Sequence, residues 1–197
     1  EHQEESRVEQ LRQVACQAEP DPDFPTVSFP NPEEEGALDL AIELAVDKNA
    51  DLVIANDPDA DRLAVVVRHG NKWRRLNGNE IGVLLAEHIL SKGQGEERLV
   101  VTTVVSSRLL SKIADFHKVK YAETLTGFKW IVRPGIEDKS SRFVFGYEEA
   151  LGFALGDSVR DKDGITSALV FAELAAEVKN DGKTVIDLLD ELWNRHG

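Results

Sequence analysis

Cysteine is nearly absent from this sequence, and its single Cys16 excludes both an internal disulfide and a zinc module built from several cysteines. No apolar run approaches the roughly 18 residues of a membrane span, so we expect no integral membrane protein. Basic residues are also few: 23 Lys and Arg stand against 36 Asp and Glu, a net charge of −13. So acidic a chain is a poor binder of nucleic acid or anionic membranes. Because no signal peptide is visible either, we expect a cytoplasmic protein.

Acidic residues and prolines are concentrated near the start of the chain. Residues 1–35 contain ten acidic and two basic residues, and so account for −8 of the net charge of −13. Five of the seven prolines lie within residues 20–32. Proline fixes φ and favours an extended conformation in the residue before it. We therefore predict an extended lead-in, with no compact domain before about residue 36.

Beyond this lead-in, short apolar runs alternate with longer helical patterns. The strands we predict are 51–55, 63–67, 73–76, 99–105, 119–123 and 142–147. The helices we predict are 37–46, 80–91, 106–116, 127–132, 165–179 and 184–195. This alternation predicts an α/β fold with mixed, largely parallel sheets and flanking helices. Ligands of such sheets bind beyond the carboxyl ends of the strands, a place occupied here by loops 56–62, 124–129 and 147–163.

The loop of residues 56–62 carries the clearest chemical signal. Asp57, Asp59 and Asp61 alternate along it, and their carboxylates would repel one another unless a hard cation such as Mg²⁺ or Ca²⁺ bound them. An EF-hand is excluded because Arg62 and Arg68 stand where glycine and an acid are required. Arg62 suits bidentate binding of a phosphate. The loop therefore indicates metal-assisted phosphoryl transfer, although a solvated acidic turn would have the same composition.

This loop resembles the metal-binding loop of the α-D-phosphohexomutases, the superfamily of phosphoglucomutases and phosphomannomutases. Other segments resemble further motifs of the superfamily in its own order, namely 24–33, 76–80, 124–130, 146–152 and 160–164. The resemblance extends from about Pro20 to the end of the chain. It implies that residues 1–75 are the C-terminal part of phosphohexomutase domain 2, and that residues 76–197 are domain 3 with its sugar-binding loop.

The resemblance also implies roles for individual residues. Asp57, Asp59 and Asp61 would bind Mg²⁺, while Arg62 would contact phosphate. Lys162 would serve the phosphate site or a proton transfer, and Glu148 would accept hydrogen bonds from sugar hydroxyls, as a carboxylate can. The residues implied around the sugar phosphate are Thr126, Gly127, Lys129 and Arg160.

Some features leave this interpretation open. Ala150 stands where the superfamily usually has a serine, a change similar to that in the phosphopentomutase-like type-2 phosphoglucomutases. The charged run 160–164 could be a solvated turn, with Asp163 capping the next helix. Glu148 and Glu149 could be two exposed acids, and we expect them to face opposite ways because strand side chains alternate.

The superfamily's phosphorylated serine, found in a Ser-His-Asn-Pro context, has no counterpart here, since none of the five histidines follows a serine. Its Arg-x-Ser-Gly-Thr phosphate loop is missing as well. The resemblance thus implies part of an isomerase that interconverts sugar 1-phosphates and 6-phosphates, inactive on its own. The implied partners are a phosphosugar, a hexose phosphate first of all, and the remaining domains of a parent chain, without nucleic acid or membrane. The alternative is a non-catalytic α/β module that binds a metal or a phosphosugar.

Overall fold

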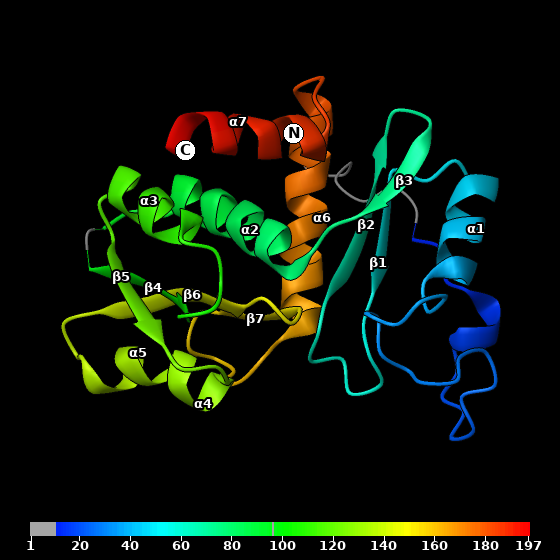
Figure 1. Cartoon of the computed structure of the whole chain (residues 1–197), viewed down its shortest axis with the longest axis horizontal. Coiled ribbons are helices and arrows are strands. Elements are labelled where there is room, and N and C mark those ends of the chain that lie inside the picture. The colour runs from blue at the N-terminus through cyan, green and yellow to red at the C-terminus, as the bar shows by residue number, and fades with distance from the viewer. Residues whose placement is uncertain (1–10, 96) are drawn as a thin grey trace, which may run out of the picture.

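The computed structural model describes residues 11–95 and 97–197 (Figure 1). Residues 1–10, which belong to the predicted lead-in, and residue 96 lie outside this range. The strands are β1 (Leu52–Ala55), β2 (Ala64–His69), β3 (Lys72–Arg75), β4 (Arg98–Thr103), β5 (Lys120–Thr124), β6 (Arg142–Glu148) and β7 (Gly152–Leu155). The helices are η1 (Ala15–Gln17), α1 (Asp39–Asp47), α2 (Gly78–Lys92), α3 (Leu109–Phe116), α4 (Phe128–Ile131), α5 (Arg133–Glu137), α6 (Gly164–Asn180) and α7 (Val185–His196).

The first sheet has three antiparallel strands in the order β1-β2-β3. Strands β2 and β3 correspond to the predicted strands 63–67 and 73–76 and form a hairpin, whose turn contains Gly70 at φ 61°. The first four residues of β2 are buried, whereas the last two are exposed. Helix α1 contacts β1 and buries Ala45. The loop of residues 56–62, which we name the acidic loop, joins β1 to β2 at one end of this sheet.

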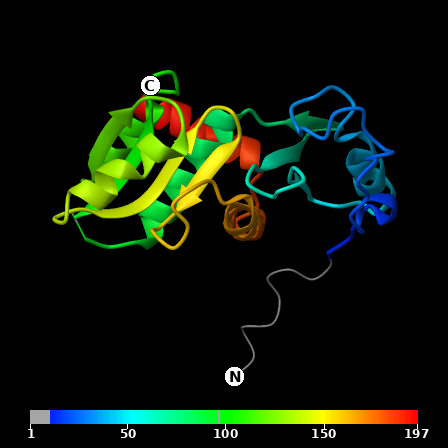
Figure 2. The same cartoon turned by 90° about the horizontal axis from the view of Figure 1, so that it is seen from below.

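The second sheet has four strands in the order β5-β4-β6-β7. Strand β4 is parallel to β5 and β6, and all six of its residues are buried. Helices α2 and α3 cover one face of this sheet, while α4 and α5 cover the other (Figures 1 and 2). The predicted α/β class with mixed sheets is confirmed, and the parallel pairing is confined to these three strands.

Strand β7 corrects the prediction that residues 147–163 form a loop. It pairs antiparallel with β6, and Glu148 faces Gly152 in the register. The reversal between the two strands is tight because Leu151 has a left-handed backbone, with φ 60°. Positive φ is rare for residues other than glycine, and a leucine at such a position does not indicate a turn in the sequence. The turn between β6 and β7 was therefore not predicted.

Helix α6 joins the two sheets. It contacts β7 on one side and β1 on the other, and Figure 2 shows it end-on between them. One hydrophobic core spans both sheets, since it includes Val65 of β2, Phe145 of β6 and Phe171 of α6. The acidic loop and the end of β6 are therefore fixed to one packed body. Within the described residues, no helix is long and apolar enough to cross a membrane.

Helix α3 begins at Leu109, three residues later than predicted. Its N-cap, Arg108, makes no capping side-chain hydrogen bond. Of the two serines at the predicted start of this helix, Ser107 accepts a hydrogen bond from the Leu109 amide at 3.2 Å. The Ser106 hydroxyl instead donates to Glu149 at 3.0 Å, so it belongs to the region around the end of β6.

Candidate active site

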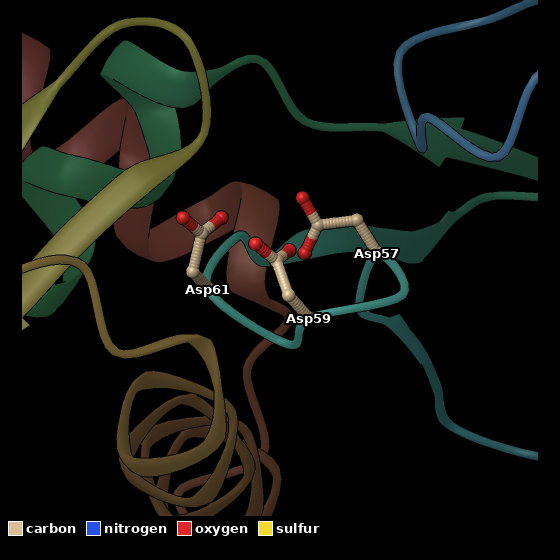
Figure 3. Close-up of side chains that lie close together, drawn as sticks. All are labelled: Asp57, Asp59 and Asp61. Atoms are coloured by element: carbon tan, nitrogen blue, oxygen red, sulfur yellow. The ribbon is translucent and has the colours of Figure 1, made fainter.

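The acidic loop, residues 56–62, brings its three aspartates to one side (Figure 3). Ala60 has φ 57°, and its amide donates to the Asp57 carbonyl at 2.9 Å, which bends the chain sharply. The Asn56 side chain donates to the Arg62 carbonyl at 2.6 Å and closes the loop. As a result, one carboxylate oxygen from each of Asp57, Asp59 and Asp61 lies within 4.8 Å of the others.

The start of α6 supports this loop from below. The Gly164 amide donates to the Ala60 carbonyl at 3.2 Å. A Cβ atom at Gly164 would lie 2.3 Å from the Arg62 carbonyl oxygen and 2.7 Å from that of Ala60, so only glycine fits there. Asp163 accepts a hydrogen bond from the Thr166 amide at 2.9 Å, which confirms its predicted role as the cap of α6. The shape of the acidic loop thus depends on a helix a hundred residues further along the chain.

The carboxylates of the acidic loop repel one another, and two cations partly offset that repulsion. Burial, followed by the charges of Asp61 and Asp59, raises the pKa of Asp57 against the lowering effect of the Arg62 amide. The Arg62 Nε atom lies 3.3 Å from Asp57 Oδ2, and Lys162 Nζ lies 2.8 Å from Asp61 Oδ2. Three convergent carboxylate oxygens are ligands of the type that a hard divalent cation takes. The residues present therefore fit Mg²⁺.

Glu148, the last residue of β6, lies beside this loop. Its Oε2 atom accepts a hydrogen bond from the Gly127 amide at 3.1 Å. Gly127 has φ 108°, a backbone conformation that only glycine adopts readily. Burial raises the pKa of Glu148, although the Gly127 hydrogen bond and the charge of Lys162 oppose this effect. Among the described residues, the Gly127 amide is the one hydrogen-bond donor to the Glu148 carboxylate.

Gly152 is the point where the three predicted loops meet. A Cβ atom there would lie 2.8 Å from Lys162 Cδ, 2.7 Å from a ring atom of Phe128 and 3.0 Å from Glu148 Cγ. Gly152 also forms an isolated antiparallel bridge with Arg62, and the Leu63 amide donates to the Leu151 carbonyl at 3.1 Å. The acidic loop is therefore joined through the backbone to the turn that follows Glu148.

Lys162 pairs with two aspartates: its Nζ atom lies 2.8 Å from Asp61 Oδ2 and 3.3 Å from Asp161 Oδ1. Burial alone would lower the pKa of Lys162, but hydrogen bonds from its ammonium to Asp61 and Asp161 outweigh burial and raise that pKa. Its Nζ atom also lies 5.5 Å from the centre of the Phe128 ring, within the range of a cation–π contact. The ammonium therefore stays charged in this position.

The structure does not bring every predicted residue into this cluster. Thr126, Lys129 and Arg160 are exposed. Lys129 Nζ lies 5.6 Å from the Trp130 ring. Within the part of the chain that the structure describes, Thr126 and Arg160 side chains form neither hydrogen bonds nor ion pairs. Within the described residues, no hydrogen bond or ion pair links these three side chains to one another or to Glu148.

Several contributors to the site were missed from the sequence. Gly152, Gly164 and Phe128 are needed for the packing around Lys162 and the acidic loop. Glu149 is held by the hydroxyls of Thr103 and Ser106. The sequence signal that could have indicated the contacts of Glu149 is the presence of Thr103 and Ser106 at and just after the end of β4. Strands β4 and β6 are parallel neighbours, so their carboxyl ends lie at the same edge of the sheet.

Two family models match this chain. The model described as "Phosphoglucomutase/phosphomannomutase, alpha/beta/alpha domain III" matches residues 77–196, more than half of the chain. The model for alpha/beta/alpha domain II of the same family matches residues 4–70. The two matches follow one another along the chain and account for nearly all of it.

Individual relatives agree with these matches. A protein named "Probable phosphomannomutase" from Haemophilus influenzae is 49% identical over 187 residues, which cover 93% of this chain and 37% of the relative. The phosphoribomutase of Saccharomyces cerevisiae is 43% identical over 193 residues, covering 92% of this chain and 31% of that protein. A crystal structure of a phosphoglucomutase from Paramecium, in an open form, matches with a TM-score of 0.65 and 26% identity, over 86% of this chain and 30% of that one. The chain thus spans about a third of the length of the proteins that it matches.

Proposed function

The chain belongs to the phosphoglucomutase/phosphomannomutase family, and from this membership we propose that it supplies the metal loop and sugar loop of a sugar-phosphate mutase. The reaction proposed is the interconversion of a sugar 1-phosphate and a sugar 6-phosphate. The observation that carries the proposal is the junction at Gly152, where Glu148 and Lys162 pack beside the backbone of the acidic loop. A metal-binding loop, a fixed cation and a half-buried carboxylate next to one another suit a phosphorylated polyol.

The acidic loop is proposed to hold Mg²⁺ on Asp57, Asp59 and Asp61. The ion would supply neutralisation of the charge on the transferring phosphoryl group, where positioning and electrostatics dominate. Arg62 and Lys162 would hold phosphate oxygens, and their present partners in the loop, Asp57 and Asp61, would then bind the ion instead. On substrate binding, Arg62 and Lys162 would therefore exchange their aspartate partners for phosphate oxygens.

Glu148 is proposed to accept hydrogen bonds from two neighbouring sugar hydroxyls. Its backbone is paired with Gly152 of β7, and the Gly127 amide occupies only one of its two carboxylate oxygens. Thr126, Lys129 and Arg160 are proposed to line the sugar phosphate, which their exposure permits. Ala150 removes one hydroxyl contact usual in the family, so we expect looser discrimination between sugars. Relatives named as phosphomannomutase, phosphoglucomutase and phosphoribomutase support a monosaccharide phosphate as the class, with a hexose phosphate as the first choice.

The phosphoserine required by this chemistry is proposed to lie outside the chain, because the chain spans only about a third of its relatives. Covalent transfer through such a serine divides one hard step into two easier ones. We accordingly expect residues 1–75 and 76–197 to be the end of domain 2 and domain 3. The two family matches support a division between residues 70 and 77. We expect the chain by itself to be inactive, and the parent protein to be cytoplasmic.

The test uses the complete protein that contains this chain. We expect it to isomerise glucose 1-phosphate or mannose 1-phosphate to the 6-phosphate, or ribose 1-phosphate to the 5-phosphate, in the presence of Mg²⁺, and to lose the activity with EDTA. Glu148→Gln should raise the KM for the sugar phosphate about tenfold by analogy with the loss of an oriented hydrogen bond to a charged group. The control Glu137→Gln, on the exposed helix α5, should leave the KM unchanged. Metal binding without turnover in the complete protein would favour the non-catalytic module instead.

A further inference from the structure

We propose that Glu149 is a positioning residue, which orients the neighbouring Glu148 by anchoring the turn that follows β6. This inference rests on the proposed role of Glu148 in sugar binding. Glu149 does not face that site. Its carboxylate instead reaches the hydroxyls of Thr103 and Ser106 at and just beyond the carboxyl end of β4.

The Glu149 carboxylate lies in a closed group of polar side chains. Its Oε2 atom accepts hydrogen bonds from Thr103 Oγ1 at 3.2 Å and from Ser106 Oγ at 3.0 Å. These two hydroxyls are themselves 2.8 Å apart. Hydrogen bonds to an ionised acceptor are stronger than neutral ones, so the side chain is held in one rotamer. Thr103 is the last residue of the buried strand β4, and this fixes the anchor to the rigid sheet.

The main chain of Glu149 is held as well. A Cβ atom at Gly78 would lie 2.0 Å from the Glu149 carbonyl oxygen and 2.7 Å from its carbonyl carbon. The first residue of α2 therefore packs directly against the backbone of the turn. Helix α2 is itself fixed by a capping box formed by Asn77 and Glu80. Glu149 is thus clamped between the start of one helix and the end of one strand.

The Glu148 side chain, in contrast, has few polar contacts. Within the described residues its carboxylate accepts one hydrogen bond, from the Gly127 amide at 3.1 Å. Ala150, the next side chain of the turn, offers no polar atom. Glu149 is the first residue of the turn and directly follows Glu148, so a shift of the Glu149 backbone would also shift Glu148. The direction of Glu148 is therefore determined largely by the anchor of its neighbour.

A purely structural role for Glu149 makes a different prediction, and two variants with one control separate the two roles. Glu149→Ala removes the anchor but leaves the Thr103 and Ser106 hydroxyls paired with each other. Glu149→Gln keeps an oxygen acceptor for both hydroxyls. Ile113→Val, in the core of α3 and away from the turn, is the control for a general loss of stability.

Kinetics of the complete protein provide the first readout. We expect Glu149→Ala to raise the KM for the sugar phosphate about tenfold with kcat within about threefold, because the contact to Glu148 is made equally in the ground and transition states. Glu149→Gln and Ile113→Val should both stay within about threefold of wild type, and Mn²⁺ affinity should stay within about twofold in all variants. A Glu149→Ala protein with unchanged KM would overturn the inference.

The second readout is the NMR signal of the Gly127 amide in this chain, because that amide donates directly to Glu148. In Glu149→Ala we expect the Gly127 signal to move to the position it takes in Glu148→Ala, and in Glu149→Gln to remain at the wild-type position. A wild-type signal in Glu149→Ala would overturn the inference even if the KM rises. If the complete wild-type protein has no mutase activity, the proposed function fails, while the Gly127 signal still decides whether Glu149 positions Glu148.

Discussion

Lys162 and Asp61 form an ion pair of 2.8 Å across the junction between the acidic loop and the segment that follows β7. The same ammonium lies near the Phe128 ring, and the aliphatic part of the Lys162 side chain packs against Gly152, so one side chain touches all three loops of the site. A bound divalent cation would compete with Lys162 for the Asp61 carboxylate. In the proposed site, Lys162 would therefore weaken binding of the metal and strengthen binding of the sugar phosphate.

This opposition predicts two changes of opposite sign in Lys162→Met. Removing a positive charge so close to the carboxylates should strengthen Mn²⁺ binding by about three- to tenfold, as expected for Coulomb interactions near a protein surface. The KM for the sugar phosphate in the complete protein should rise at least about tenfold, because a phosphate contact is lost. Isothermal titration with Mn²⁺ and steady-state kinetics measure the two effects. Lys139→Met, on an exposed turn, is the control, and weaker Mn²⁺ binding in Lys162→Met would contradict the proposed competition.

Gly164→Ala tests the support of the acidic loop by α6. The added methyl group would lie 2.3 Å from the Arg62 carbonyl oxygen, so the loop must shift. We expect a loss of about 1–3 kcal/mol in the free energy of unfolding, which is usual for overpacking, together with weaker Mn²⁺ binding. Urea unfolding and Mn²⁺ titration measure these effects.

Gly182→Ala is the matched control for that variant. Gly182 has φ 73° and open space around it, so alanine there brings backbone strain without contact to the acidic loop. Its stability should fall by about 1 kcal/mol while its Mn²⁺ affinity stays at the wild-type value. Equal Mn²⁺ affinities in the two variants would mean that α6 does not set the geometry of the loop.

His88 predicts a pH dependence of stability outside the site. Burial, followed by the charge of Lys92, lowers the pKa of His88, and Glu177 and Glu173 only partly oppose this. A lowered pKa means that the unfolded chain binds more protons over the interval between the two pKa values, so the free energy of unfolding falls as the pH drops below about 6.5. His88→Gln should show a shallower decline than wild type in urea unfolding between about pH 8 and about pH 5. Parallel curves for the two proteins would show that this histidine does not contribute.

The parts of the site that the sequence predicts are those whose residues are neighbours in the chain. Asp57, Asp59 and Asp61 lie in one short turn, so their spacing alone indicates a cation site, and the structure does place their carboxylates together. The alternation of apolar runs likewise predicts the α/β class, because periodicity follows directly from burial.

Contacts between distant residues could not be predicted in this way. Glu149 and Thr103 are 46 residues apart, and their hydrogen bond depends on the parallel pairing of β4 with β6. Strand β7 was missed because its turn depends on the left-handed backbone of Leu151, which a leucine side chain does not signal. In the sequence, Gly164 is only the last residue of the charged run 160–164, and its importance appears only when the acidic loop is seen packed against it.

Asp59 offers the cleanest test of the metal site, because it is the exposed member of the three aspartates. Within the described residues its carboxylate forms no hydrogen bond or ion pair, so Asp59→Asn removes a charge without removing a contact. The free energy of unfolding should therefore change by no more than about 0.5 kcal/mol, as is usual for a surface substitution. Mn²⁺ affinity should fall at least about tenfold, and the complete protein should lose at least about two orders of magnitude in rate, by analogy with a lost source of charge stabilisation.

Mn²⁺-induced broadening of amide NMR signals locates the ion: it should be centred on residues 56–62 in wild type and disappear in Asp59→Asn. Asp51→Asn is the control and should retain the broadening, because Asp51 is an exposed residue directly before β1 whose carboxylate pairs with Lys179 at 2.8 Å. Equal broadening in wild type and Asp59→Asn would place the cation elsewhere and leave residues 56–62 as a solvated acidic turn.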